Sequence, residues 1–348
     1  MHFKTRLTNW YSIYKRNLPW RHTKNPYYVW LSEIIMQQTQ VKQGLPYYEA
    51  FVSSFPTVFD LANAHEEDVL KLWQGLGYYS RARNLHASAK HIAADRNGEF
   101  PNTYSEIIKL KGVGDYTASA LASICFHEPT AVVDGNVYRV LSRYFGIKTP
   151  INSTEGIKEF KKLATTLIDH EHPGDYNQAL MEFGAIQCKP KNPDCTVCPF
   201  NTSCVALQND LVDQLPVKLQ KTKVTKKHFN FLVLMSSNGR TLFEKRTKKG
   251  IWQNLYQFPL IETKGELTAD TFKNNPQIEA YFKALPFEYS LFNSKQLVHK
   301  LSHQHLYTKF WIIEVDTLPK EGIPISEVKS FPTSILISNF IDAFNFSS

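Results

Sequence analysis

The chain has no run of about 18 apolar residues, the length that a membrane-spanning helix requires. Residues 1–16 also lack an apolar segment followed by small residues, so they do not read as a secretory signal. The sequence contains no internal repeat and no low-complexity tract. These absences argue against a membrane, secreted or repeat protein, and we expect a cytoplasmic protein with no membrane partner.

Cysteine is scarce, because only five occur among 348 residues and four of them lie between Cys188 and Cys204. The remaining one, Cys125, stands in an apolar helical stretch. Reactive sensor thiols usually sit in electropositive, partly exposed settings, so we expect Cys125 to serve packing. The chemistry of the thiols is therefore concentrated in one short segment.

The composition indicates two domains and a polyanionic partner. An apolar content of 43% over 348 residues is enough for a substantial core, and the length fits two domains better than one. Forty Lys and Arg residues against 32 Asp and Glu residues give a net charge of +8 and an isoelectric point near 9.0. Nucleic acid is one partner that such a charge favours.

The spacing of apolar residues along the sequence changes once, near residue 208. Residues 1–207 show the i, i+3, i+4 apolar spacing of successive helices, interrupted by prolines such as Pro46. Residues 208–227 include a lysine-rich stretch and are expected to form a linker. Residues 228–348 contain short runs of β-forming residues, with a turn at Asn238–Gly239. The fold class predicted is an all-α domain followed by an α+β domain.

The four clustered cysteines have the pattern Cys188-x6-Cys195-x2-Cys198-x5-Cys204. Three prolines between them favour a compact loop that can surround one metal centre. A reducing cytosol disfavours disulfides. Structural zinc usually takes two close C-x2-C-like pairs, whereas thiolate-only ligation also suits a [4Fe–4S] cluster. The spacing thus predicts a metal centre, for which an iron–sulfur cluster and zinc are both candidates.

A pair of glycines separates two predicted helices in the middle of the first domain. Thr103-x-x-Glu106 has the pattern of a capping box and opens a short helix, and a second helix begins near Asp115. Between them, Gly112 and Gly114 allow backbone N–H groups to point outward beside a helix N-terminus, where they can bind phosphate. The alternative is a tight helix–helix turn without any ligand.

Two carboxylates are candidates for chemistry. Asp134 follows an apolar run and precedes a helix, so it is either an N-cap or an ionised catalytic group, and the two roles can coexist. Glu33 lies between apolar residues of a helix predicted over Val29–Val41. If buried, it would have a raised pKa and could act as a general acid; otherwise it is an ordinary surface residue.

Taken together, these motifs resemble those of the MutY-type adenine DNA glycosylases, a family of the helix-hairpin-helix, iron–sulfur DNA glycosylase superfamily. The likeness covers nearly all of residues 1–205, in the order of that family. The segments that carry it are LPWR (18–21), WLSEIIMQQTQV (30–41), GLGYYSRARNLH (75–86), LKGVGDYTASA (110–120), VDGNVYRVLSR (133–143) and the four cysteines.

The resemblance implies a reaction and roles for particular residues. Glu33 matches the acid that protonates adenine, and Asp134 the carboxylate that stabilises a positively charged sugar, as in retaining glycosidases. Water then completes hydrolysis. Tyr116 and Asn136 match supporting residues of the active site. Arg21 matches a further supporting residue of the active site and is expected, with Gly112 and Gly114, to bind DNA. Gln38, Leu76 and Tyr78 match DNA-binding residues that enter the stack beside the lesion.

The resemblance also implies a cofactor and a substrate. The four cysteines would hold a [4Fe–4S] cluster with a structural, DNA-facing role. The substrate would be double-stranded DNA with adenine opposite 8-oxoguanine or guanine, acted on by a monomer at the nucleoid of a bacterium. Relatives that cleave the strand carry a lysine where this chain has Tyr116, so we expect hydrolysis of the base without strand cleavage.

The second domain resembles the MutT-like (Nudix-like) C-terminal domain of the same family through residues 249–259. It lacks the R-E-x-x-E-E helix that binds magnesium in hydrolytic relatives, and is expected to recognise the lesion. Leu301-Ser302-His303 matches a Phe-Ser-His loop, so Ser302 and His303 are the candidate readers of 8-oxoguanine. A half-buried strand position, or a metal pair of His303 with His305, are the alternatives.

Three rival functions remain from the sequence. An endonuclease III-like glycosylase and lyase acting on oxidised pyrimidines is disfavoured by Tyr116 and by the second domain. A catalytically silent DNA-binding protein is disfavoured by Glu33 and Asp134. A nucleotide pyrophosphohydrolase is disfavoured by the absent Glu-rich helix.

Overall fold

The computed structural model describes residues 3–219, 224–283, 286–344 and 346. The chain forms two compact units. The helical unit consists of Met1–Asn63 and Asn84–Gln220, and the sheet unit consists of Ala64–Arg83 and Lys221–Ser348. Among the described residues, no helix has both the length and the apolar character needed to cross a membrane.

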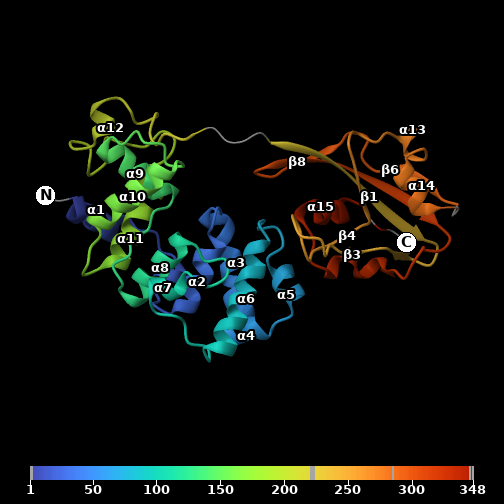
Figure 1. Cartoon of the computed structure of the whole chain (residues 1–348), viewed down its shortest axis with the longest axis horizontal. Helices are drawn as coiled ribbons and strands as arrows, with labels where there is room; N and C mark the ends of the chain where they lie inside the picture. The colour runs from blue at the N-terminus through green and yellow to red at the C-terminus, as the bar shows by residue number, and fades with distance from the viewer. Residues whose placement is uncertain (1–2, 220–223, 284–285, 345, 347–348) are drawn as a thin grey trace. The chain divides into compact units, whose positions relative to one another are not determined.

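The helical unit is built from helices throughout the part that the structure describes (Figure 1). Its elements are α1 (Phe3–Tyr14), η1 (Pro19–Arg21), α2 (Pro26–Ile35), α3 (Val41–Ser54), α4 (Val58–Asn63), α6 (Ser80–Asp95, whose first turn belongs to the sheet unit), α7 (Tyr104–Ile107), α8 (Asp115–Phe126), α9 (Gly135–Phe145), α10 (Thr154–Leu167), α11 (Pro173–Glu182), the π-helical segment η2 (Phe183–Gln187) and α12 (Val205–Gln208).

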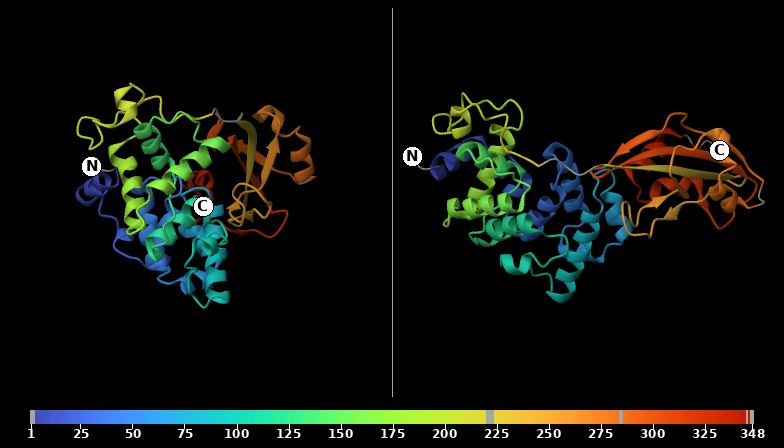
Figure 2. Two further views of the ribbon diagram at one scale, coloured as in Figure 1. Left: turned by 60° about the vertical axis from the view of Figure 1, so that its left-hand side comes forward. Right: turned by 45° about the horizontal axis from the view of Figure 1, so that its top comes forward.

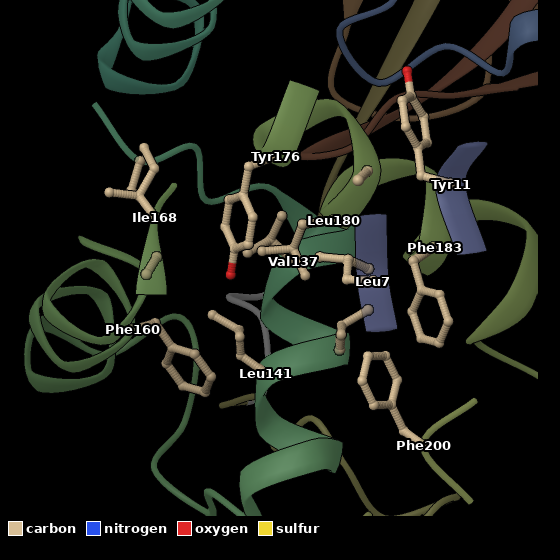
Figure 3. Packing of buried hydrophobic residues seen from close by; sticks show 14 of the residues in the cluster. Leu7, Tyr11, Val137, Leu141, Phe160, Ile168, Tyr176, Leu180, Phe183 and Phe200 are labelled. Atoms are coloured by element: carbon tan, nitrogen blue, oxygen red, sulfur yellow. The ribbon is translucent and has the colours of Figure 1, made fainter. Parts of the chain in front are cut away.

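Helix α9 is held in place by one apolar face. Val137 and Leu141 are fully buried and pack with Phe160, Tyr176 and Leu180 of α10 and α11 (Figure 3). Full burial of each such side chain stabilises the fold by about 1.5–3 kcal/mol. Because the face is fixed along its length, the N-terminus of α9 has a defined position.

Helix α8 packs closely against α2 and α11 because its buried face is made of small residues. Ala118 and Ala122 are completely buried, and Ser119 and Ser123 are as well. The short side chains allow neighbouring backbones to approach. As a result, the beginning of α8 lies beside α2, which carries Glu33.

Two helix boundaries differ from the sequence prediction. The helix expected over Val29–Val41 ends at Ile35, because the chain turns through Gln38 at a positive φ of 54° before α3 begins. Pro46, expected to interrupt a helix, lies inside α3. Gln40, within the range of the predicted helix, is instead the N-cap of α3.

The expected capping box at the start of α7 is also absent. The Thr103 side chain makes no capping hydrogen bond, and the Tyr104 N–H instead donates to the carboxylate of Glu128, at 2.6 Å. Glu106 pairs with Arg96 at 3.1 Å. The helix forms at the expected place, but a residue distant in sequence caps it.

The sheet unit contains a mixed sheet with helices on both faces. Its elements are α5 (Glu66–Leu72), β1 (Thr225–Ser236), β2 (Arg240–Thr241), β3 (Glu244–Lys245), β4 (Tyr256–Gln257), β5 (Leu260–Thr263), α13 (Ala269–Phe272), α14 (Pro276–Phe282), β6 (Glu288–Leu291), β7 (Leu297–Lys300), β8 (Gln304–Val315), β9 (Ile323–Pro324), η3 (Ile325–Ser330) and α15 (Ile335–Ala343).

The central pair of strands, β1 and β8, runs parallel over its whole length (Figure 2). The strand order is β5-β1-β8-β6, and β7 also pairs with β8. Alternation sends successive side chains to opposite faces. Trp311 stacks on Phe272 of α13 at 4.1 Å, whereas Phe310 stacks on Phe340 of α15 at 4.0 Å. The predicted change from an all-α to an α+β architecture is confirmed.

The division of the chain differs from the predicted domains 1–207 and 228–348 in two respects. Residues 64–83 group with the sheet unit, because their polar side chains bond to it. Part of the predicted linker 208–227 packs on the helical unit, since the carbonyls of Leu215 and Val217 accept hydrogen bonds from Arg143 and Ile151. Residues 220–223 of that linker lie outside the described residues.

Candidate active site and DNA-facing surfaces

Asp134 is the N-cap of α9. Its Oδ1 accepts hydrogen bonds from the backbone N–H groups of Asn136 and Val137, at 2.9 and 2.8 Å. The preceding extended run is fixed by Asn177, which accepts from the Val132 N–H at 3.1 Å. The predicted capping role is confirmed, and it leaves the carboxylate at the positive end of the helix dipole.

The second oxygen of Asp134 is occupied by the Asn136 side chain, whose Nδ2 donates to Oδ2 at 2.7 Å. Asn136 is itself held by Arg139, which donates to its Oδ1 at 2.9 Å. The same Arg139 Nη2 donates to the Gly184 carbonyl at 2.6 Å. A Cβ at Gly184 would lie only 2.6 Å from the Asn136 Cβ, so only glycine leaves this space.

Burial raises the pKa of Asp134 above its usual 3.8, while hydrogen bonds from Val137 and Asn136 and the charge of Arg139 oppose that rise. The donors stabilise the ionised form and therefore limit the effect of burial. The carboxyl group of Asp134 is thus partly exposed, with its lone pairs directed at fixed donors.

Glu33 is on the apolar helix α2, which begins with Asn25 as a cap and Pro26 at its first turn. Glu33 is 9% exposed, so the surface alternative is excluded. Burial raises its pKa to about 7; a hydrogen bond from Tyr116 and the charge of Arg21 lower it, while the Asp134 charge raises it. A large fraction of Glu33 is therefore protonated at neutral pH.

Tyr116, in the first turn of α8, lies close enough to Glu33 and Asp134 for the charges of both carboxyl groups to affect its pKa. Burial raises its pKa well above 10, and the charges of Glu33 and Asp134 raise it further. The phenol therefore stays neutral and hydrogen-bonds with Glu33. Its hydroxyl also lies 3.5 Å from the Met181 sulfur.

Arg21 is engaged by a buried carboxylate that the sequence analysis did not single out. Glu182 accepts hydrogen bonds from Nη1 and Nη2 of Arg21 at 3.0 and 2.7 Å, and from Nε and Nη2 of Arg16 at 2.8 and 2.7 Å. Burial raises the pKa of Glu182, but the two guanidinium groups overcome this and lower it to about 2. The structure thus places Arg21 beside the carboxyl site, close enough for its charge to lower the pKa of Glu33.

The glycine pair has the backbone geometry of a hairpin between α7 and α8. Gly112 has a φ of 80°, which only glycine adopts easily, and a Cβ there would lie 2.6 Å from the Asn84 Cβ. Gly114 is the N-cap of α8. Both glycines are exposed, whereas Val113 between them is buried. The exposed amides leave room for a ligand at the helix N-terminus.

The three residues expected to enter the DNA stack have different surroundings. Gln38 is exposed at a positive φ of 54°, and Tyr78 is 49% exposed at a φ of 47°. Leu76 is only 5% exposed. Gln38 and Tyr78 are therefore accessible as the chain stands, and Leu76 is not.

Ser302 and His303 form the exposed turn between β7 and β8. Their side chains lie 3.3 Å apart, Oγ to Nδ1, and the Leu301 N–H donates to the Gln304 carbonyl at 2.9 Å. The alternative of a half-buried strand position is excluded. In the described part of the chain, no group of three or more His, Cys, Asp or Glu residues is arranged to hold a metal ion, so nothing supports a metal pair of His303 with His305.

These two residues line a pocket within the sheet unit together with the turn before α6. Its walls come from residues 76–80, Arg83, residues 250–252 and residues 300–303. Tyr78, Ser302 and His303, which the sequence analysis assigned to different domains, therefore face one cavity.

The four cysteines line one small cavity, of about 30 Å³, with mostly apolar walls. Arg143 points into this region, because its Nη1 lies 3.4 Å from the Cys188 sulfur and donates to the Lys189 carbonyl at 2.7 Å. The thiols are free, and within the described residues they are not gathered tightly enough around one point to hold a single metal ion.

Comparison with known proteins supports both units. The family of HhH-GPD superfamily base excision DNA repair proteins matches residues 31–165, and the NUDIX domain family matches residues 230–343. The adenine DNA glycosylase of Buchnera aphidicola subsp. Baizongia pistaciae is 37% identical over 313 residues, which are 89% of this chain and 86% of that protein. The human adenine DNA glycosylase is 43% identical over 222 residues, 61% of this chain and 41% of that protein.

Solved structures give the same fold for the helical part. A thermostable thymine-DNA glycosylase is 30% identical with a TM-score of 0.55, covering 60% of this chain and 95% of that one. An endonuclease III chain, solved in a non-covalent complex with DNA, is 22% identical with a TM-score of 0.52 and covers 61% and 99% of the two chains. The second likeness concerns the fold alone.

Proposed function

The chain belongs to the adenine DNA glycosylase family, and we propose that it excises adenine from duplex DNA by hydrolysis of the N-glycosidic bond, using Glu33 and Asp134. The observation that carries this proposal is a pair of carboxyl groups, Glu33 buried and Asp134 partly exposed, that both act on the pKa of Tyr116 and have different surroundings. Burial raises the pKa of Glu33 to about 7, although the Tyr116 hydrogen bond and the Arg21 charge oppose this, whereas Asp134 accepts three hydrogen bonds. Such a division of environments assigns one carboxyl to the acid role and the other to the anionic role.

In the first step, Glu33 donates its proton to a ring nitrogen of adenine. The electron pair of the breaking C1′–N bond then passes to the base, which leaves neutral. General acids contribute most when their pKa lies near the working pH, because both protonation and proton transfer are then favourable. A pKa of about 7 meets this requirement, and the usual 4.5 does not.

Positive charge develops on the deoxyribose as the base leaves, and Asp134 stabilises it. The carboxylate is already fixed by Asn136 and by the α9 N-terminus, so little reorganisation is needed when the charge appears. Water then adds to C1′ and gives its proton to the Glu33 carboxylate. This restores the acid and leaves an abasic site, and the atoms balance.

Tyr116, Asn136 and Arg21 position these groups in the proposed reaction. The Tyr116 hydroxyl holds Glu33, and the Asn136 amide holds Asp134. Arg21 is fixed by Glu182, so its charge reaches Glu33 without forming an ion pair that would keep Glu33 ionised.

The proposed enzyme does not cleave the strand. Cleavage by β-elimination requires an amine that forms a Schiff base with the sugar, and the matching position holds the neutral phenol of Tyr116. The sugar product is therefore expected to remain an intact abasic site.

Access to adenine requires that it leave the duplex, at a cost of a few kcal/mol that a mismatch lowers. We assign the hairpin amides of Gly112 and Gly114 to the phosphate backbone and the exposed Gln38 and Tyr78 to the stack. Leu76 would have to leave its buried position to take the role implied by the family. Ser302 and His303 are the proposed readers of 8-oxoguanine opposite adenine.

We assign a [4Fe–4S] cluster to Cys188, Cys195, Cys198 and Cys204. Three observations support it: all four line one cavity, its walls are largely apolar, and Arg143 donates toward a sulfur. Hydrogen bonds and positive charge near the sulfurs stabilise anionic thiolate clusters. Bound there, the cluster would hold the loop in shape beside DNA, and it has no part in the hydrolytic step. We further propose action as a monomer on DNA of the bacterial nucleoid.

The test is single-turnover release of adenine from a duplex with one adenine opposite 8-oxoguanine. Thymine opposite the same lesion serves as control, and strand cleavage is scored without alkali. Adenine release without cleavage is the expected result. Release of thymine, or cleavage at oxidised pyrimidines, would instead assign the chain to a different glycosylase class; no release from cluster-loaded protein would leave a DNA-binding protein without the activity.

A further inference from the structure

The turn that carries Tyr78 is fastened to the sheet unit by the rest of segment 64–83. Six side chains of this segment form hydrogen bonds with residues 245–338. They are Glu66, Glu67, Lys71, Gln74, Tyr79 and Arg83. A segment with so many polar attachments is an integral part of the sheet unit.

Tyr79 connects the turn directly to this attachment. Its hydroxyl donates to the Thr333 carbonyl at 2.9 Å and accepts from the Gly75 N–H at 3.2 Å. Tyr79 is 5% exposed and Thr333 2%, so the bond is shielded from water. One hydroxyl thereby holds both ends of the turn, because Tyr79 closes it and Gly75 opens it.

The backbone of the turn needs such support. Gly75, Gly77 and Tyr78 all have positive φ, at 95°, 78° and 47°. Tyr78 is strained there, because an L side chain is disfavoured in this region. Its ring is nevertheless 49% exposed. Because Tyr78 is half exposed, core packing does not explain its strained backbone. The turn instead keeps the aromatic side chain accessible to a ligand.

Gln74 provides a second, independent attachment next to the turn. Its Oε1 accepts from the Thr333 N–H at 3.1 Å, and its Nε2 donates to Oγ of Ser338 on α15, at 3.0 Å. Thr333 is therefore bound on both its N–H and its carbonyl by two residues of segment 64–83.

We propose that Tyr79 and Gln74 are positioning residues for lesion discrimination. They fix the Tyr78 turn to the unit that carries Ser302 and His303. The residue that enters the DNA stack (Tyr78, the wedge) and the residues that recognise 8-oxoguanine (Ser302 and His303, the reader) then contact the lesion in a fixed relative position. The inference rests on the proposed function, because it takes Tyr78 as the wedge. The common pocket lined by Tyr78, Ser302 and His303 is the place where both would meet the damaged base pair.

Locking has a thermodynamic consequence for recognition. A turn that is free before binding must be ordered at the expense of affinity, whereas a turn already held loses little freedom. The benefit is largest where reader and wedge act on the same base pair. Loosening the turn should therefore weaken selection of 8-oxoguanine over guanine more than it slows excision itself.

The experiment compares Tyr79→Phe with Tyr256→Phe. Each removes one hydroxyl from the attachment of segment 64–83, but the Tyr256 hydroxyl donates to Glu67 at 2.8 Å, away from the turn. Single-turnover rates are measured over a range of protein concentration, on duplexes with adenine opposite 8-oxoguanine and opposite guanine. Tyr79→Phe should reduce the preference for the lesion about tenfold, mainly in half-saturating concentration, and Tyr256→Phe should leave it unchanged.

Equal effects of the two substitutions, or an unchanged preference in Tyr79→Phe, would overturn the inference. Hydrogen exchange at residues 75–80 should become faster in Tyr79→Phe and stay unchanged in Tyr256→Phe. If Tyr79→Phe is poorly folded, Ser338→Ala removes the acceptor of the Gln74 amide without replacing a residue of the turn, and should shift the preference in the same direction. A wild type that does not release adenine would contradict the proposed function instead, so the two failures are distinguishable.

Discussion

The protonated state of Glu33 should be visible in the stability of the protein. In the unfolded chain Glu33 ionises near its usual pKa of 4.5, but in the folded chain it stays protonated up to about pH 7. The folded state therefore binds more protons between these values, and its stability falls as pH rises through this window. At 1.36 kcal/mol per pKa unit, the loss attributable to Glu33 is about 3 kcal/mol above pH 7.

Glu33→Gln removes this loss, because an amide does not ionise. Its stability relative to the wild type should therefore rise between pH 5 and pH 8, whatever constant offset the change of side chain introduces. For a unit of this size the difference in Tm should grow by about 5–10 °C. Tm would be followed by far-ultraviolet circular dichroism, which the helical unit dominates.

Glu49→Gln on α3 is the matched control, because it removes an exposed carboxylate from the same unit. Its Tm difference from the wild type should stay nearly constant with pH. A pH-independent difference for Glu33→Gln would refute the reasoning, since it would mean that the buried carboxyl does not hold its proton. Excision by this variant should meanwhile fall about 10²–10⁴-fold with duplex binding retained, as gel-shift titration would report.

Other substitutions test the remaining groups. Asp134→Asn should retain the helix cap and duplex binding but lower single-turnover excision by at least about 100-fold, and normal excision would remove Asp134 from the mechanism. Glu182→Gln leaves two guanidinium groups without their carboxylate and should destabilise the protein by on the order of 3 kcal/mol at neutral pH. Because the pKa of Glu182 is lowered to about 2, this difference should be full above about pH 4.5 and shrink as pH falls toward 2; urea titrations would measure it. Cys198→Ser should lose the visible absorbance of the cluster-loaded protein and bound iron by direct assay, whereas Cys125→Ser should keep both.

The fold class, an all-α domain followed by an α+β domain, could be predicted because it depends on local periodicity. The position of Asp134 was equally accessible, since an acidic residue after an apolar run and before a helix is a cap wherever the helix packs. Both predictions, the fold class and the capping role of Asp134, depend on interactions between residues close together in sequence.

What failed depends on contacts distant in sequence. Periodicity continued the helix of Glu33 past Ile35, but the turn at Gln38 is set by tertiary packing. Glu182 was overlooked although it is an isolated acid in an apolar run, a pattern that indicates a buried ion pair. Its partners, Arg16 and Arg21, lie more than 160 residues away, so spacing alone could not identify them.

Segment 64–83 belongs to the sheet unit although it lies between two parts of the helical unit in sequence, and this affects how domains can be exchanged between related proteins. A domain attached only through its end can be exchanged between relatives at the linker. Here the exchange would leave Glu67, Lys71 and Tyr79 facing loops of another sequence, because their hydrogen-bond partners lie within residues 245–333. A functional chimera therefore needs two crossovers around residues 64–83 as well as the one near 220, and substitutions in these two stretches are expected to be inherited together.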